Sequence, residues 1–132
     1  MKTSLVRTNA ILPFEAASDL TGQVGRFVVP SASDKVILVS SPTEKPLGVL
    51  LTDGKQGDRV SVAIGAGGLA GTVRVKLASV VSGPGVDLQI TSHGHVVADT
   101  GSGARVLVAQ SLESGTVDEL IEAVLFRPVA LT

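Results

Sequence analysis

The stretch Asp58-Arg59-Val60-Ser61-Val62-Ala63-Ile64 decides the fold of this chain, because polar and apolar residues alternate along it. Thr72-Val73-Arg74-Val75-Lys76-Leu77 and Val86-Asp87-Leu88-Gln89-Ile90-Thr91 alternate in the same way. Successive side chains of a strand point to opposite faces, so each segment has one face to bury and one to leave in water. The pattern predicts an all-β protein built as a small shell.

Segments of this kind follow one another from Val24 onward, separated by turns rich in Gly, Pro, Asp and Ser. Short strands with turns about every 8–12 residues are typical of a β-barrel or sandwich of antiparallel strands. Leu47–Leu51 is apolar on both faces, which predicts a central strand covered on both sides. We expect a single β domain over residues 21–132, with strands at Arg26–Val29, Lys35–Ser40, Leu47–Thr52, Arg59–Ile64, Thr72–Ser79, Val86–Thr91, His95–Asp99, Arg105–Ser111 and Leu120–Arg127.

Residues 1–20 do not alternate cleanly. Ile11-Leu12-Pro13-Phe14 is apolar, but Pro13 has no backbone N–H to give to a sheet, so this segment is at best an edge strand or an extended arm. We expect residues 1–20 (Met1–Leu20) to form an N-terminal arm. It is either a loosely docked terminus or an arm that lies against a partner.

The C-terminal segment has two interpretations. Thr116-Val117-Asp118-Glu119 has the form of a helix capping box, and Leu120–Leu125 could continue as a helix. An internal echo favours a strand instead. A shift of 60 residues aligns pairs such as Gly25 with Gly85, Val36 with Val96, Leu47 with Leu107, Asp58 with Asp118, Ala63 with Ala123 and Val60 with Leu120. If the echo is a true repeat, two related β-halves face each other and Leu120–Leu125 copies Val60–Ile64.

Composition disfavours several classes of function. The chain has 132 residues, a formal net charge of −1 and scattered Lys and Arg, whereas a protein that binds nucleic acid usually shows a basic stripe. It has no Cys, which excludes disulfides, thiolate catalysis and Cys-based zinc sites. No stretch approaches 18 consecutive apolar residues, so we expect no membrane span. Without Trp or Tyr, the chain lacks the usual residues of sugar and base platforms.

One glycine-rich segment matches a cofactor motif. Gly65-Ala66-Gly67-Gly68-Leu69-Ala70 fits the dinucleotide fingerprint G-x-G-x-x-G/A and follows a predicted strand. That fingerprint works only where a helix begins, because the helix N-terminus holds the pyrophosphate. The residues that follow alternate as a strand, so we interpret the segment as an inter-strand loop and expect no cofactor.

His93-Gly94-His95 is the one histidine pair in the sequence. Two extended His residues at i and i+2 could share a metal with Asp87 or Asp99, but a closed site needs three or four ligands. Gly94 favours a hairpin turn with both imidazoles in solvent. The acid pairs Asp53/Asp58 and Asp118/Glu119 fall in turns, where Asp suits the backbone. We therefore predict no catalytic or metal residues and expect a protein that is not an enzyme.

The strongest family signal lies in three stretches: Pro46–Gly54 with Gly57–Ala63, Val106–Thr116, and Leu120–Pro128. Together they resemble the small head-decoration, or capsid cement, proteins of tailed bacteriophages, over roughly Val24–Pro128. The resemblance implies a compact β-barrel or sandwich that binds the outer surface of an assembled shell and stabilises it. It implies the major capsid protein as partner, a virion location after synthesis in the host cytoplasm, and a homo-oligomer, with a trimer favoured over a dimer.

The family offers no catalytic motif to transfer, and its capsid contacts do not map onto this chain, so the contact residues stay unknown. Strand edges and apolar loops such as Gly67-Gly68-Leu69 could supply subunit contacts by β-augmentation. Two other functions stay open. One is a ligand-binding β-barrel, or an enzyme at an oligomer interface that uses His93 and His95. The other is a structural module of a phage tail or baseplate.

Overall fold

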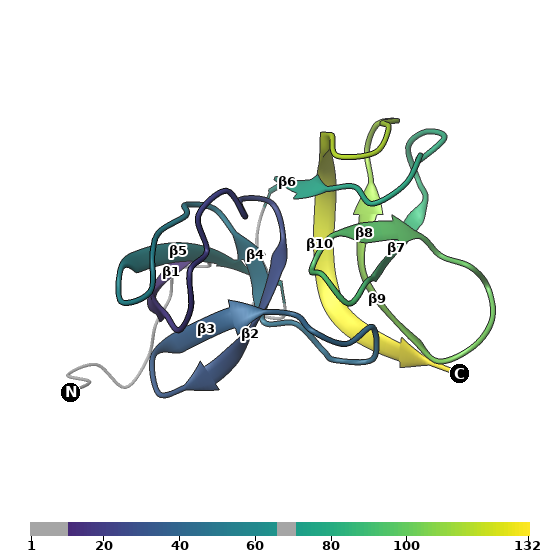
Figure 1. Ribbon diagram of the computed structural model, residues 1–132. Helices are drawn as coiled ribbons and strands as arrows, with labels where there is room; N and C mark the ends of the chain where they lie inside the picture. The colour runs from purple at the N-terminus through teal and green to yellow at the C-terminus, as the bar shows by residue number, and fades with distance from the viewer. Residues whose placement is uncertain (1–10, 66–70) are drawn as a thin grey trace.

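The computed structural model describes residues 11–65 and 71–132, and in these residues every regular element is a strand (Figure 1). The first half carries five strands, and the second half carries five more. The bounds are β1 Ile11–Ala16, β2 Phe27–Ala32, β3 Lys35–Leu38, β4 Gly48–Leu50, β5 Arg59–Ile64, β6 Val73–Lys76, β7 Asp87–Ile90, β8 Val96–Ala98, β9 Arg105–Ser111 and β10 Leu120–Leu131.

Each half is a curved sheet of five strands. In the first half the sheet closes into a barrel with the order β1-β3-β2-β4-β5, and β1 pairs with both β3 and β5. In the second half the order is β6-β10-β9-β7-β8, and a parallel bridge from Leu77 to Val96 joins the two ends of the sheet. Figure 1 shows the halves side by side, with the long β10 along the second. The all-β prediction is confirmed.

The expected strands from Arg26 onward all form, and those at Arg59–Ile64 and Arg105–Ser111 have the expected bounds. Leu47–Leu51 supplies the three-residue strand β4, which is buried on both faces between β2 and β5. Leu120–Leu125 is part of strand β10 and not a helix. Only half of the capping box forms, since the Glu119 carboxylate accepts a hydrogen bond from the Thr116 N–H in a turn. Asp118, with φ of 68°, ends any helical path there.

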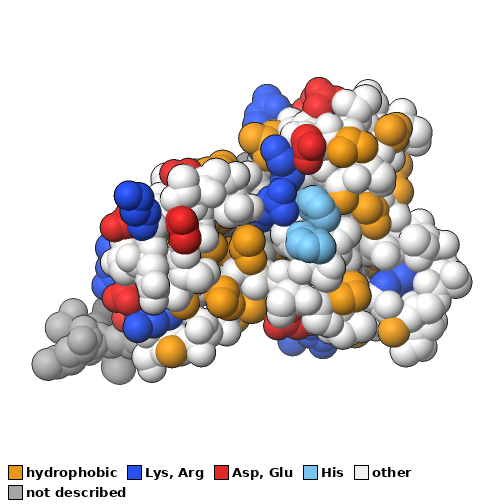
Figure 2. Space-filling model, viewed as in Figure 1, with side chains coloured by type: hydrophobic (Ala, Val, Ile, Leu, Met, Phe, Trp, Pro, Cys, Tyr) orange, Lys and Arg blue, Asp and Glu red, His pale blue; other side chains and the backbone are white. Residues whose placement is uncertain are grey.

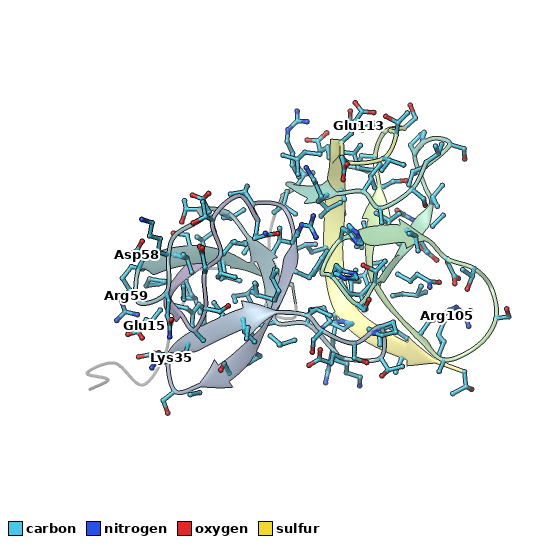
Figure 3. The ribbon with its side chains drawn as sticks, viewed as in Figure 1. Glu15, Lys35, Asp58, Arg59, Arg105 and Glu113 are labelled. Atoms are coloured by element: carbon cyan, nitrogen blue, oxygen red, sulfur yellow. The ribbon has the colours of Figure 1, made fainter. Side chains whose placement is uncertain are left out.

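The expected N-terminal arm is corrected for part of its length. Residues 11–16 are not an arm but strand β1 of the barrel, while residues 1–10 lie outside the described residues. Pro13 is tolerated because it lies opposite Ser61, whose N–H and C=O both bond toward Thr52 and Leu51 on the other side. No ladder bond is therefore lost at Pro13. The Glu15–Lys35 ion pair (3.3 Å) spans the β1–β3 pairing (Figure 3).

The two halves repeat the same topology. Pairs β2–β3, β2–β4, β4–β5 and β1–β5 are antiparallel, as are the equivalent pairs β7–β8, β7–β9, β9–β10 and β6–β10. The parallel β1–β3 contact has its equivalent in the Leu77–Val96 bridge. Positive φ angles recur at equivalent turns, at Gly25 and Gly85, Asp34 and Gly94, and Gly57 and Asp118. The structure therefore contains two related halves, as the echo indicated.

The repeat also extends to the core, with one correction to the frame. Gly25 N–H bonds to Leu50 O, and Gly85 N–H bonds to Ser111 O, so the shift is 60 residues at the first pair and 61 at the second. The second half therefore has one more residue between its third and fourth strands. The predicted pairing of Val60 with Leu120 was wrong by one residue: Val60 is 1% exposed and Leu120 is 37% exposed, and the buried equivalent is Ile121.

The halves share a hydrophobic core. Inside the barrel lies a cluster drawn only from the first half, with Val28, Val36, Leu50 and Val62 among its members. The larger cluster joins both halves. It takes Phe27, Val29, Val39, Val49 and Ala63 from the outer face of the barrel, and residues such as Leu77, Leu88, Ile90, Val96, Val108 and Ile121 from the second half.

Candidate functional site

The histidine pair lies in the turn between β7 and β8, as predicted. Gly94 has φ of 83°, and its amide bonds to Thr91 O while its carbonyl accepts from the Phe27 amide of the first half. An added Cβ at Gly94 would lie 2.8 Å from Phe27 O, so the turn requires glycine. His93 is exposed, whereas His95 is half-buried. The expectation that both rings lie in solvent was therefore wrong for His95.

His95 is held as a structural residue of this turn. Its Nδ1 is hydrogen-bonded to the Thr91 hydroxyl, which also donates to the His95 carbonyl at 2.9 Å. Burial lowers the pKa of His95, and the positive charge of Arg26 lowers it further. Arg26 itself donates to the His93 carbonyl at 3.0 Å. The ring centroids of His93 and His95 are 5.8 Å apart and tilted.

The candidate acids serve the turns in which they lie. Asp58 accepts from the Lys55 N–H, and Asp53 accepts from the Gly22 N–H, so both close loops of the first half. Hydrogen bonds from Thr116 lower the pKa of Glu119. The guanidinium of Arg105, labelled in Figure 3, bonds Asp99 and lowers its pKa. Within residues 11–65 and 71–132, no group of three or more His, Asp and Glu side chains is placed to hold a metal ion.

Two predictions concern residues that the structure does not describe. The loop Gly65–Ala70 is described only at Gly65, and the apolar contact loop Gly67-Gly68-Leu69 lies outside the described residues. In the described part of the chain, no helix is long and apolar enough to cross a membrane.

The described surface carries apolar side chains at one end of the second half. We call residues 78–86 and 112–119 the second-half tip, and the equivalent residues 17–25 and 51–58 the first-half tip. Val80 and Val117, both in the second-half tip, are 63% and 55% exposed, the highest values among the large apolar residues described. Leu112 in the same tip is 38% exposed. Figure 2 shows apolar and acidic side chains together over this upper end of the molecule.

The backbone of the second-half tip is fixed by hydrogen bonds. Val81 and Gly115 bond reciprocally, with N–H to O distances of 2.9 and 3.0 Å. An added Cβ at Gly115 would lie 2.5 Å from Ile121 and 2.8 Å from Leu77, so the two loops pack closely on the core. Ser111 donates to Gly83 O and accepts from Val86 N–H, which anchors the far end. Val80 and Val117 therefore project from a well-anchored scaffold.

Sequence reasoning missed this surface. Val80 continues the apolar alternation that begins at Thr72, and Val117 was part of the apparent capping box, so both residues looked like parts of regular elements. The missing signal was in the repeat. With the shift of 61 residues, Val80 aligns with Asp19 and Val117 with Gln56, so the second copy is apolar where the first is polar.

Comparison with known proteins gives one informative result. No protein-family model matches the chain, and no curated protein matches it in sequence. Among solved structures, the chain is similar to the crystal structure of the head fiber gp8.5 N base of bacteriophage phi29. The TM-score is 0.67 at 20% sequence identity, and the match covers 92% of this chain and 97% of that chain.

This likeness shows the fold. Nearly the whole of the phi29 chain is matched, so the arrangement of both halves is that of a phage head protein. The sequence resemblance to phage head-decoration proteins led to the same kind of particle.

Proposed function

We propose that this chain is a non-enzymatic structural protein of a tailed-phage virion that binds the outer surface of the head and stabilises the shell. The observation that carries the proposal is the fold match, across 97% of its length, to a protein described as the base of a phage head fiber. Its support from sequence is the resemblance of Val24–Pro128 to capsid cement proteins. Both lines lead to the head by different routes.

The physical role follows from linkage. A protein that binds the assembled shell, and not its separated subunits, stabilises the shell by mass action. Symmetric oligomers bring several weak contacts to symmetry-related sites at once, and this multiplies the strength of binding. We propose a homotrimer on this ground. Its solution mass would be about 40 kDa, three times the 13.4 kDa of one chain.

The test is binding to heads purified from a phage strain that lacks this gene. The purified protein, at micromolar concentration, should pellet with the heads in a saturable manner, and decorated heads should resist heating better than bare ones. Major capsid protein that has not assembled is the control and should bind far more weakly. Absence of co-sedimentation with intact heads would reject the proposal. Pelleting with isolated tails instead would assign the chain to the tail or baseplate.

A further inference from the structure

We propose that the second-half tip is the surface that contacts the shell, and that it seats in an apolar hollow of the partner bordered by Lys or Arg side chains. This inference rests on the proposed function and states which end of the molecule faces the head. The one-sided chemistry of the tip, compared with its equivalent in the first half, carries it.

The repeat provides an internal control for the fold. Both tips use the same hydrogen bonds: Leu20 N–H to Gly54 O in the first, and Val81 N–H to Gly115 O in the second. The first-half tip forms these bonds with Asp19 and Gln56 exposed at the equivalent positions. The backbone therefore does not require valine at positions 80 and 117. Two exposed valines on a scaffold that accepts polar residues favour an intermolecular contact.

The charge of the second-half tip defines the partner. Its residues include three acids, Glu113, Asp118 and Glu119, and no Lys or Arg. Glu113, labelled at the upper end of Figure 3, accepts from the Glu122 N–H, and Glu119 accepts from Thr116, so both carboxylates are held at the border of the apolar residues. A partner surface that is basic around an apolar centre matches this arrangement.

The same charges disfavour a second copy as the occupant. Two tips meeting face to face would bring Glu113, Asp118 and Glu119 of one copy against those of the other, and like charges across an interface oppose binding. The basic side chains of β6, Arg74 and Lys76, lie to one side of this end: Lys76 N–H bonds to Gly25 O of the first half. In Figure 2 the Lys and Arg side chains follow the groove between the halves.

The test compares two double variants in the head-binding assay. Val80→Asn with Val117→Gln gives the tip nearly the chemistry of Asp19 and Gln56 without changing its net charge. We expect an unchanged fold and solution mass but binding to gene-deleted heads weakened about tenfold to a hundredfold, since each buried valine contributes about a factor of ten. Ile37→Thr with Val129→Thr removes exposed apolar side chains elsewhere, 37% and 45% exposed, and should bind as the wild type does.

A third variant tests the charge of the border. Asp118→Asn keeps a residue that tolerates positive φ, so it should fold normally, bind heads a few times more weakly and show less dependence on salt.

The outcomes separate the two proposals. If the wild type does not bind heads, the proposed function fails. If the wild type binds and the Val80/Val117 variant binds equally well, the function stands and the tip assignment is overturned. A change in solution mass in that variant would make the tip a contact between copies and would also overturn it.

Discussion

At the scale of single residues, the sequence predicted the type of local structure better than the environment of each side chain. Gly94 indicated a turn, and the turn is there, but nothing in His93-Gly94-His95 shows that Thr91 binds one of the two rings. Arg26 is 69 positions before His95 in the sequence, and only the packing of the halves brings its charge close. Long-range contacts of this kind cannot be derived from local pattern.

His95 gives a prediction about pH. Its pKa is below 6.5 in the folded state, so the unfolded chain binds more protons in the interval between the folded pKa and 6.5. The free energy of unfolding should therefore fall as the pH falls from 6.5 through that interval. His95→Gln should reduce this dependence, which thermal unfolding at pH 7.5 and 5.5 would measure.

His93→Gln is the matched control, since His93 is exposed in the same turn. It should leave the pH dependence of unfolding as in the wild type. If both variants show the wild-type slope, burial of His95 is not its cause.

At the scale of elements, the strands were predictable because most bury one face. β1 was the exception: its role as a barrel strand depends on Ser61 directing its hydrogen bonds away from Pro13, and this is a property of the β4–β5 pairing. The repeat frame slipped for a related reason. Since side chains alternate, one extra residue between β8 and β9 moves every later residue to the opposite face.

Gly48 in β4 should be the least replaceable glycine of the barrel. An added Cβ there would lie 1.9 Å from Ala63 O and 2.8 Å from its carbonyl carbon, both backbone atoms of β5. Gly48→Ala must push β4 and β5 apart, and we expect it to lower the free energy of unfolding by about 1–3 kcal/mol or more. Denaturant unfolding measures the change.

Gly83→Ala makes the matched comparison. Gly83 has no atom within 4 Å of an added Cβ and no positive φ, so its replacement should change stability by less than about 0.5 kcal/mol. Equal effects of the two substitutions would contradict the close approach of β4 and β5.

At the scale of the whole molecule, the shared core predicts that the two halves unfold together. Phe27 is 2% exposed and belongs to the first half, yet it lies in the cluster that contains Leu88 and Val96 of the second. Phe27→Leu should therefore lower hydrogen-exchange protection in β7 and β8 as well as in β2. Loss of protection confined to the first half would show two independent units.

The repeat gives the molecule two similar scaffolds, and the differences between them carry the functional account. The first half has polar tips and its own barrel core, while the second half presents Val80 and Val117. The most direct measurement is a cryo-electron-microscopy map of gene-deleted heads incubated with the purified protein. The account predicts two-lobed density on the outer surface of the shell, with the second-half tip facing the capsid. Heads without added density, or with density only on their inner surface, would contradict it.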